Sequence, residues 1–162
     1  MSDTLAVLAD IHGNTWALEA VLADLDRRGV TAVVNLGDCA YGSLDPAGTL
    51  DLLMARGIPT ISGNQDRIVH APPPEVQESA DHTFVTARLS AEQVAWLQAL
   101  PATLVVGEVF CCHGTPDSDE TYLLEEVTPH GVRLREDAAL HALLAGVAQP
   151  VVVCGKPLPR LG

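Results

Sequence analysis

The feature that most constrains the fold is a repeated unit, in which a short apolar run is followed by an amphipathic segment. Residues 5–9 form an uninterrupted apolar run, the pattern of a strand buried on both faces. Asn14 is a good N-cap, apolar residues then recur at helical spacing, and Gly29 stands where a helix would end. The unit recurs with a strand at 32–36 and a helix within 45–57. Alternating strands and helices predict a mostly parallel sheet with helices on its faces.

The second half of the chain departs from this alternation. After a third strand at 58–61, a capping box at Ser90 opens another helix. The apolar runs 102–106 and 109–112 are joined by Gly-Glu, which predicts a β-hairpin. The remaining expectations are a loop over 114–131, a helix over 136–144 and a last buried strand at 151–153. The fold class is therefore mixed, α/β with α+β character and a second or mixed sheet.

Size and charge limit the partners and the location. A chain of 162 residues suits a single domain over 1–162. The net charge of −12 disfavours binding to long nucleic acid and to anionic membranes.

No apolar run in the sequence approaches the ~18 residues that a membrane-spanning helix needs. The start lacks a basic signal region and the four cysteines lack C-x-x-C spacing, so we expect reduced thiols and a cytoplasmic protein.

Polar side chains follow the predicted strands at the points where these strands end. Asp10 and His12 follow the first strand, Asp38 the second, Asn64 the third and His113 the hairpin. The carboxyl ends of neighbouring parallel strands lie side by side, so these side chains can converge. Carboxylate, imidazole and amide oxygen suit borderline divalent ions such as Mn²⁺, Zn²⁺ or Fe²⁺. Each motif alone is ordinary turn chemistry, but turns do not explain four of them in this order.

In combination, these motifs resemble the calcineurin-like metallophosphoesterases, and especially their small bacterial phosphodiesterase branch. The matching segments are Asp10-x-His12-Gly13-Asn14, Gly37-Asp38, Gly63-Asn64-Gln65-Asp66 and His113-Gly114. The resemblance continues to Val127-Thr128-Pro129 and so covers nearly the whole chain. It implies a sandwich of two mixed sheets flanked by helices, with two divalent metal ions at the carboxyl ends of the strands.

The resemblance also implies a role for each residue. Asp10 and His12 would bind one ion, Asn64 and His113 the other, and Asp38 would bridge both. Asp38, Asn64 and His113 are accordingly the expected catalytic residues. Two ions of Mn, Zn, Fe or Ni would clamp a phosphoryl group and activate the attacking water. No other cofactor is expected.

Two departures from the family pattern bear on activity. Gln65 stands where many members have a histidine, and glutamine cannot donate a proton as a general acid, so substrates with good leaving groups would be favoured. Gly155-Lys156-Pro157 stands where the family has Gly-His-x-His, so each ion would lose one imidazole and bind more weakly. The family normally continues beyond this point with further strands. We therefore expect a C-terminally truncated fold whose exposed sheet edge could support a homo-oligomer.

The sequence thus predicts a metal-dependent phosphoesterase that hydrolyses a small phosphodiester or phosphomonoester with a metal-activated water. The alternative is a catalytically impaired phosphoesterase-like domain that acts as a ligand- or partner-binding module. The missing histidines are the feature that favours this alternative.

Overall fold

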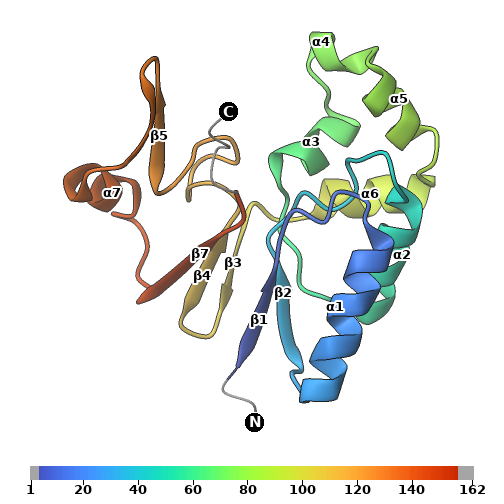
Figure 1. Ribbon diagram of the computed structural model, residues 1–162, viewed down its shortest axis with the longest axis horizontal. Coiled ribbons are helices and arrows are strands. Elements are labelled where there is room, and N and C mark those ends of the chain that lie inside the picture. The colour runs from blue at the N-terminus through green and yellow to red at the C-terminus, as the bar shows by residue number, and fades with distance from the viewer. Residues whose placement is uncertain (1–3, 157–162) are drawn as a thin grey trace.

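A two-stranded parallel sheet lies at the centre of the computed structural model, which describes residues 4–156 (Figure 1). Strand β1 (Leu5–Leu8) pairs with β2 (Ala32–Asn35). Between them runs α1 (Thr15–Arg28), which begins where Asn14 Oδ1 accepts a hydrogen bond from the Ala17 N–H, at 3.1 Å. Gly29 ends α1 with a left-handed φ of 69°. The first predicted strand–helix–strand unit is confirmed.

Six helices lie to one side of this sheet, some alongside it and others beyond the carboxyl ends of its strands (Figure 1). They are α1, α2 (Pro46–Arg56), α3 (Asn64–His70), α4 (Pro74–Gln77), α5 (Ala80–Thr86) and α6 (Ala91–Ala99). Asp45 caps α2, Gly57 ends it, and a capping box at Ser90 opens α6, all as predicted. A buried apolar cluster that includes Leu18 and Leu50 fills the space beneath these helices.

The expected third strand at 58–61 is not formed. Only an isolated parallel bridge joins Thr60 to Asn35. The backbone of Asn35 donates to Pro59 O at 2.9 Å and accepts from Ile61 N at 3.0 Å. Proline has no N–H to extend a ladder, so the pairing stays one bridge long. The bridge still brings the segment that follows Ile61 to the end of β2.

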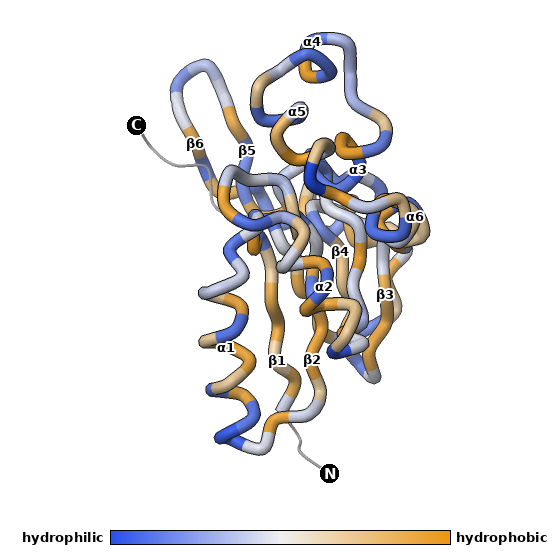
Figure 2. The backbone as a smooth tube through the Cα atoms, turned by 90° about the vertical axis from the view of Figure 1, so that its right-hand side faces the viewer, coloured by the Kyte–Doolittle hydropathy of each residue, from blue (hydrophilic) through white to orange (hydrophobic). Residues whose placement is uncertain are grey.

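The second sheet is mixed, in the order β3 (Thr103–Val106), β4 (Val109–Cys112) and β7 (Val151–Cys154). Strands β3 and β4 form the predicted hairpin, with Gly107 at a φ of 60°, and β7 runs parallel to β4. A second apolar cluster, which includes Val34, Leu36 and Cys111, packs this sheet against β1 and β2. Strands β1, β2, β3 and β4 are largely apolar along their lengths (Figure 2). The predicted mixed α/β class, with several sheets and flanking helices, is confirmed.

A hairpin that the sequence did not predict begins within the loop expected over 114–131 and continues beyond it. It consists of β5 (Glu125–Thr128) and β6 (Gly131–Leu134), and α7 (Asp137–Leu143) follows it. Side-chain pairs of Glu126 with Arg133 and Arg135 hold it together. Val127 is 64% exposed and Leu134 75%. Each strand has only four residues and few apolar positions, too few to establish the apolar alternation by which strands are recognised.

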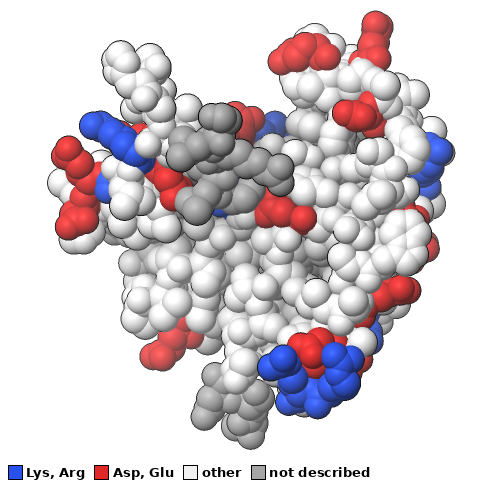
Figure 3. Space-filling model, viewed as in Figure 1, with Lys and Arg blue, Asp and Glu red and all other residues white. Residues whose placement is uncertain are grey.

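Basic side chains on the surface are largely paired with acidic ones. Figure 3 shows the main group of basic side chains at one end of the molecule, interspersed with acidic ones. At the C-terminal turn of α1, Arg27 and Arg28 pair with Asp24, and Arg56 of α2 pairs with Asp26. Among the helices of residues 4–156, none has both the length and the apolar character to cross a membrane.

Candidate metal centre

Two loops at the carboxyl ends of β1 and β2 form the floor of the candidate site. Backbone hydrogen bonds join them in three successive steps. Asp10 N donates to Gly37 O, His12 N to Asp38 O and Gly13 N to Cys39 O, at 2.9–3.0 Å. The β1–β2 pairing therefore continues beyond the strands, and the loops bring Asp10, His12 and Asp38 to one place.

The backbone of this site is strained. Asp10, His12 and Asp38 have φ values of 53°, 51° and 55°, and within residues 4–156 they are the only residues other than glycine with positive φ. A left-handed conformation costs a residue with a Cβ ~1–2 kcal/mol. Such strain persists where the surrounding structure enforces it, and it gathers at functional sites.

The same three side chains form a group with the geometry of metal ligands. One ligand atom from each of Asp10, His12 and Asp38 lies within 4.8 Å of the others. His12 Nδ1 lies 3.0 Å from the carbonyl of Tyr41, so Nδ1 carries the hydrogen, and Nε2 faces Asp10 Oδ1 at 3.5 Å. The hydrogen bond to Asp10 outweighs partial burial and raises the pKa of His12. A ring nitrogen fixed in this way next to carboxylates is the usual state of a metal-binding histidine.

His113 extends the group from the other sheet. It directly follows β4, and its Nδ1 lies 2.7 Å from the carbonyl of Leu36. Its Nε2 lies 3.5 Å from Asp38 Oδ2, is buried and has no hydrogen-bond partner. Burial disfavours the protonated ring, but the Asp38 carboxylate outweighs this and raises the pKa of His113. A buried nitrogen without a partner calls for an explanation, and a cation or a proton shared with Asp38 supplies one.

Asp66 holds the loop of Asp38 in place, a role that the sequence did not reveal. Its fully buried carboxylate accepts hydrogen bonds from the backbone N–H groups of Asp38, Cys39 and Gly63, at 2.7–2.9 Å. Burial raises the pKa of Asp66 to about 6, with Asp38 adding to this and the N–H donors opposing it. The one local signal was an acidic residue in the first turn of α3, where an N-terminal capping role was the simplest reading.

Two glycines permit the close approach of these segments. A Cβ at Gly63 would collide with the carboxylate of Asp38, and one at Gly37 would collide with the backbone of Gly63. With this space free, the Gln65 N–H reaches Asp38 Oδ1 at 2.9 Å. The Gly37-Asp38 and Gly63-Asn64 pairs therefore belong to a single packed unit.

Asn64 has a different neighbour from the other candidate ligands. It is the first residue of α3, and its Oδ1 accepts a hydrogen bond from Lys156 Nζ at 3.1 Å. Thus the structure groups Asp10, His12 and Asp38, places His113 against Asp38, and places Asn64 against Lys156. The assignment of these residues to particular ions stays a prediction. Of the expected truncated end, Gly155 and Lys156 are described, whereas Pro157 lies outside the described residues.

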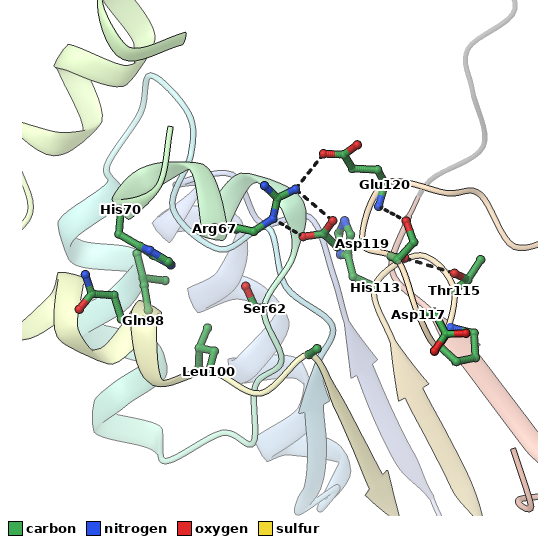
Figure 4. A pocket seen from close by; sticks show the side chains of 14 residues that line it. Ser62, Arg67, His70, Gln98, Leu100, His113, Thr115, Asp117, Asp119 and Glu120 are labelled. Atoms are coloured by element: carbon green, nitrogen blue, oxygen red, sulfur yellow. Dashed lines mark hydrogen bonds and ion pairs between the residues drawn. The ribbon is translucent and has the colours of Figure 1, made fainter. Parts of the chain in front are cut away.

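A cavity of about 510 Å³ borders the site on the side of His113 (Figure 4). Apolar residues of the α6 region, including Leu97 and Leu100, line one part of it, and the loop that follows His113 lines another. Arg67 of α3 bridges α3 and this loop by binding Asp119 at 2.8 Å and Glu120 at 2.8 Å (Figure 4). Arg67 is thereby committed to these carboxylates, and its proximity lowers the pKa of Asp119.

The donor set at Asp10, His12 and Asp38 fits a divalent cation. It offers two carboxylates and an imidazole, the mixture that Mn²⁺, Zn²⁺ and Fe²⁺ accept. The buried Nε2 of His113 is a fourth donor next to Asp38. The residues present are therefore suited to hold at least one such ion.

Comparison with known proteins agrees with this geometry. The sequence model of the calcineurin-like phosphoesterase family matches residues 4–159. An uncharacterized protein of Methanocaldococcus jannaschii is 36% identical over 62 residues, which make up 38% of this chain and 26% of that protein.

Three solved structures share the fold. A metallophosphoesterase of Sphaerobacter thermophilus matches with a TM-score of 0.69 and 24% identity, over 91% of this chain and 58% of that one. A hypothetical protein of Pyrococcus horikoshii matches with a TM-score of 0.67 and 21% identity, over 89% and 66%. A putative diadenosine tetraphosphatase matches with a TM-score of 0.57 and 19% identity, over 83% and 65%. The present chain thus spans about three-fifths to two-thirds of the lengths of these structures.

Proposed function

Because this chain belongs to the calcineurin-like phosphoesterase family, we propose that it is a metal-dependent phosphoesterase that hydrolyses a small phosphodiester or phosphomonoester. The observation that carries the proposal is the group of Asp10, His12 and Asp38, whose ligand atoms lie within 4.8 Å of one another on a strained backbone. Neither the strain nor the crowding of two carboxylates favours folding, so both support a site built for a cation.

The proposed ligand set is the one that the family resemblance implies. Asp10 and His12 would hold one ion, Asn64 and His113 a second, and Asp38 would lie between them. The chemistry that such ions supply is polarisation of the phosphoryl group and activation of water, and Mn, Zn, Fe and Ni are the candidates. The contacts support the first ion more directly, because Asn64 Oδ1 already accepts a hydrogen bond from Lys156.

The residues around the ion site would keep the proposed metal ligands fixed in position. Asp66 and the Gln65 N–H hold Asp38, and the carbonyls of Tyr41 and Leu36 hold the rings of His12 and His113. Gln65 itself offers no proton for a leaving group, so esters with good leaving groups are the proposed substrates.

The cavity beside His113 supports a small organic group on the ester. Its volume of about 510 Å³ lies in the usual range of small-molecule sites. The net charge of −12 opposes the approach of long nucleic acid. Since one structural neighbour is titled a putative diadenosine tetraphosphatase, dinucleoside polyphosphates belong among the compounds to assay.

The second candidate function is a catalytically impaired domain that binds a ligand or partner. The hydrogen bond from Lys156 to Asn64 favours it, because this bond engages one of the proposed metal ligands. A single domain over 1–162, a cytoplasmic location and a homo-oligomer through a sheet edge remain further proposals. The free state of all four cysteines supports the cytoplasmic location.

Metal analysis combined with hydrolysis tests these alternatives. The protein is dialysed against Mn²⁺, its bound metal is measured, and hydrolysis of bis(p-nitrophenyl) phosphate and p-nitrophenyl phosphate is followed. We expect bound Mn²⁺ and hydrolysis that is lost with EDTA and in Asp38→Asn. Bound metal without hydrolysis of any ester would favour the binding module, and the absence of bound metal would contradict both the metal site and the proposed activity.

A further inference from the structure

Lys156 is fixed beside Asn64, one of the proposed metal ligands. It is the only lysine of the sequence. Its backbone N–H donates to His113 O at 2.7 Å, which continues the pairing of β7 with β4 for two residues beyond the strands. Its Nζ donates to Asn64 Oδ1 at 3.1 Å and to the carbonyl of Asp119 at 3.3 Å, and it lies 5.3 Å from the centroid of the Tyr122 ring. Backbone and ammonium are thus both held in position.

The surroundings of this ammonium are those of a cation site. Asn64 and Asp119 offer uncharged oxygens, and the ring of Tyr122 offers its face, which attracts positive charge. Two of the three donors of Nζ are used by these oxygens. The same Oδ1 is the only side-chain oxygen that Asn64 can give to a metal ion. A divalent ion at this oxygen would have to displace Nζ or lie within a few ångströms of another positive charge, and both are unfavourable.

We propose that the ammonium of Lys156 takes the place of a second metal ion, so that the centre binds a single divalent ion at Asp10, His12 and Asp38. The inference rests on the proposed phosphoesterase activity and revises its ligand set, because the second ion that the family resemblance implies at Asn64 and His113 is replaced by the ammonium of Lys156. That charge is held at the carbonyl of Asp119, which lines the cavity together with His113, so it would attract the phosphoryl oxygens of a bound ester. Lys156 is therefore also a substrate-binding residue, through charge attraction to the phosphate.

Metal stoichiometry tests the proposal directly. The full chain, Lys156→Met and Lys156→His are each titrated calorimetrically with Mn²⁺, and bound metal is counted after dialysis. Arg56→Met is the matched control, because it removes one positive charge far from the site, on the surface of α2. We expect one ion per chain for the wild type and the control. We expect a second ion in both Lys156 variants, bound more tightly in Lys156→His, whose imidazole adds a ligand.

Two results of the titration would overturn the proposal. The first is a wild-type protein that binds two ions. The second is a pair of Lys156 variants that still bind only one, which would show that the lysine is not what excludes the second ion.

The unique lysine provides a second measurement that does not depend on turnover. With ¹⁵N-lysine, the protein gives one side-chain ammonium signal in NMR. We expect the chemical shift of this signal to change in Asn64→Ala and to stay unchanged in Asn14→Ala. When Zn²⁺ binds to the wild type, we expect the signal to keep the chemical shift of an ammonium bound to Asn64. A signal typical of a solvent-exposed lysine, before or after Zn²⁺ is added, would overturn the proposal. If the single ion and the held ammonium are found but no ester is hydrolysed, the proposed function fails while this inference stands.

Discussion

The carboxylate of Asp66 accepts a hydrogen bond of 2.7 Å from the backbone N–H of Asp38, so one buried acid holds the backbone of another. Asp66 is fully buried, and Asp38 is nearly so. The two negative charges repel each other, which adds to the effect of burial on the pKa of Asp66. The ionised Asp66 therefore lowers the stability of the fold while it holds the backbone of Asp38 in place, and this effect has a measurable dependence on pH.

Asp66→Asn should change how stability depends on pH. The pKa of Asp66 is about 6 in the folded protein, against 3.8 as the ordinary value. The folded state thus holds this proton more tightly than the unfolded state, and stability falls as pH rises between these two values, by about 3 kcal/mol. The variant cannot titrate here, so the wild type's stability relative to the variant should decline over this range and level off above about pH 7. Urea unfolding of both proteins measures this, and parallel curves would contradict it.

Asp38→Asn should abolish metal binding while the fold persists. Asparagine has nearly the same volume and keeps an oxygen for the Gln65 N–H, but it lacks the negative charge. We expect the affinity for Mn²⁺ to fall by at least about 100-fold, more than the loss of an outer hydrogen-bond partner causes. Calorimetry measures the affinity, and circular dichroism checks the fold. Asp24→Asn, on the surface of α1, is the control, and unchanged Mn²⁺ binding by Asp38→Asn would refute the assignment of this carboxylate.

His12→Ala and Asn64→Ala should differ sharply. His12 belongs to the group of three ligands, so its loss should weaken Mn²⁺ binding by at least about 100-fold. Asn64 is engaged by Lys156, so its loss should change the affinity by less than about tenfold. Titration of both variants under the same conditions decides this. Equal losses would mean that Asn64 binds the ion and that its contact with Lys156 does not survive metal binding.

Gly63→Ala should damage the site by crowding alone. The added Cβ would meet the carboxylate and the backbone nitrogen of Asp38. We expect the free energy of unfolding to drop by about 1–3 kcal/mol, the usual cost of overpacking, with weaker Mn²⁺ binding. Gly146→Ala is the matched control, because its Cβ would meet nothing within 4 Å. If the two variants were equally stable, the close contact of Gly63 with Asp38 would not be a constraint.

Features with a local cause could be predicted from the sequence. Asn14 and Gly29 bound α1 as expected, because a side chain that accepts from the first turn and a glycine that turns left-handed act within a few residues. The Gly107-Glu108 turn between β3 and β4 also has a local cause. Of the candidate site, the grouping of Asp10, His12 and Asp38 followed from the rule that ligands collect at strand ends.

Features that depend on residues far away in the sequence could not be predicted in this way. The strand expected at 58–61 does not form because Pro59 lies where a backbone N–H donor would be needed. Only the pairing with β2 reveals this, and the pairing cannot be seen in the sequence. The hairpin of β5 and β6 is held by ion pairs between its two strands and the residue that follows them, and strands of four residues are too short for apolar periodicity to reveal them. Lys156 meets Asn64 across 92 positions of sequence, so neither residue predicts the other. The support that Asp66 gives to Asp38 is likewise a tertiary contact.

The three backbone hydrogen bonds between the loop of Asp10 and the loop of Asp38 have a consequence for motion. Since they extend the β1–β2 ladder, one loop cannot swing away without breaking the ladder next to it. The amide hydrogens of Asp10, His12 and Gly13 should therefore exchange with solvent through one shared opening event rather than separately. The proposed ligands would then come together and separate in one step. The rate of cation binding would depend on local opening of the β1–β2 ladder rather than on the rotation of any one side chain.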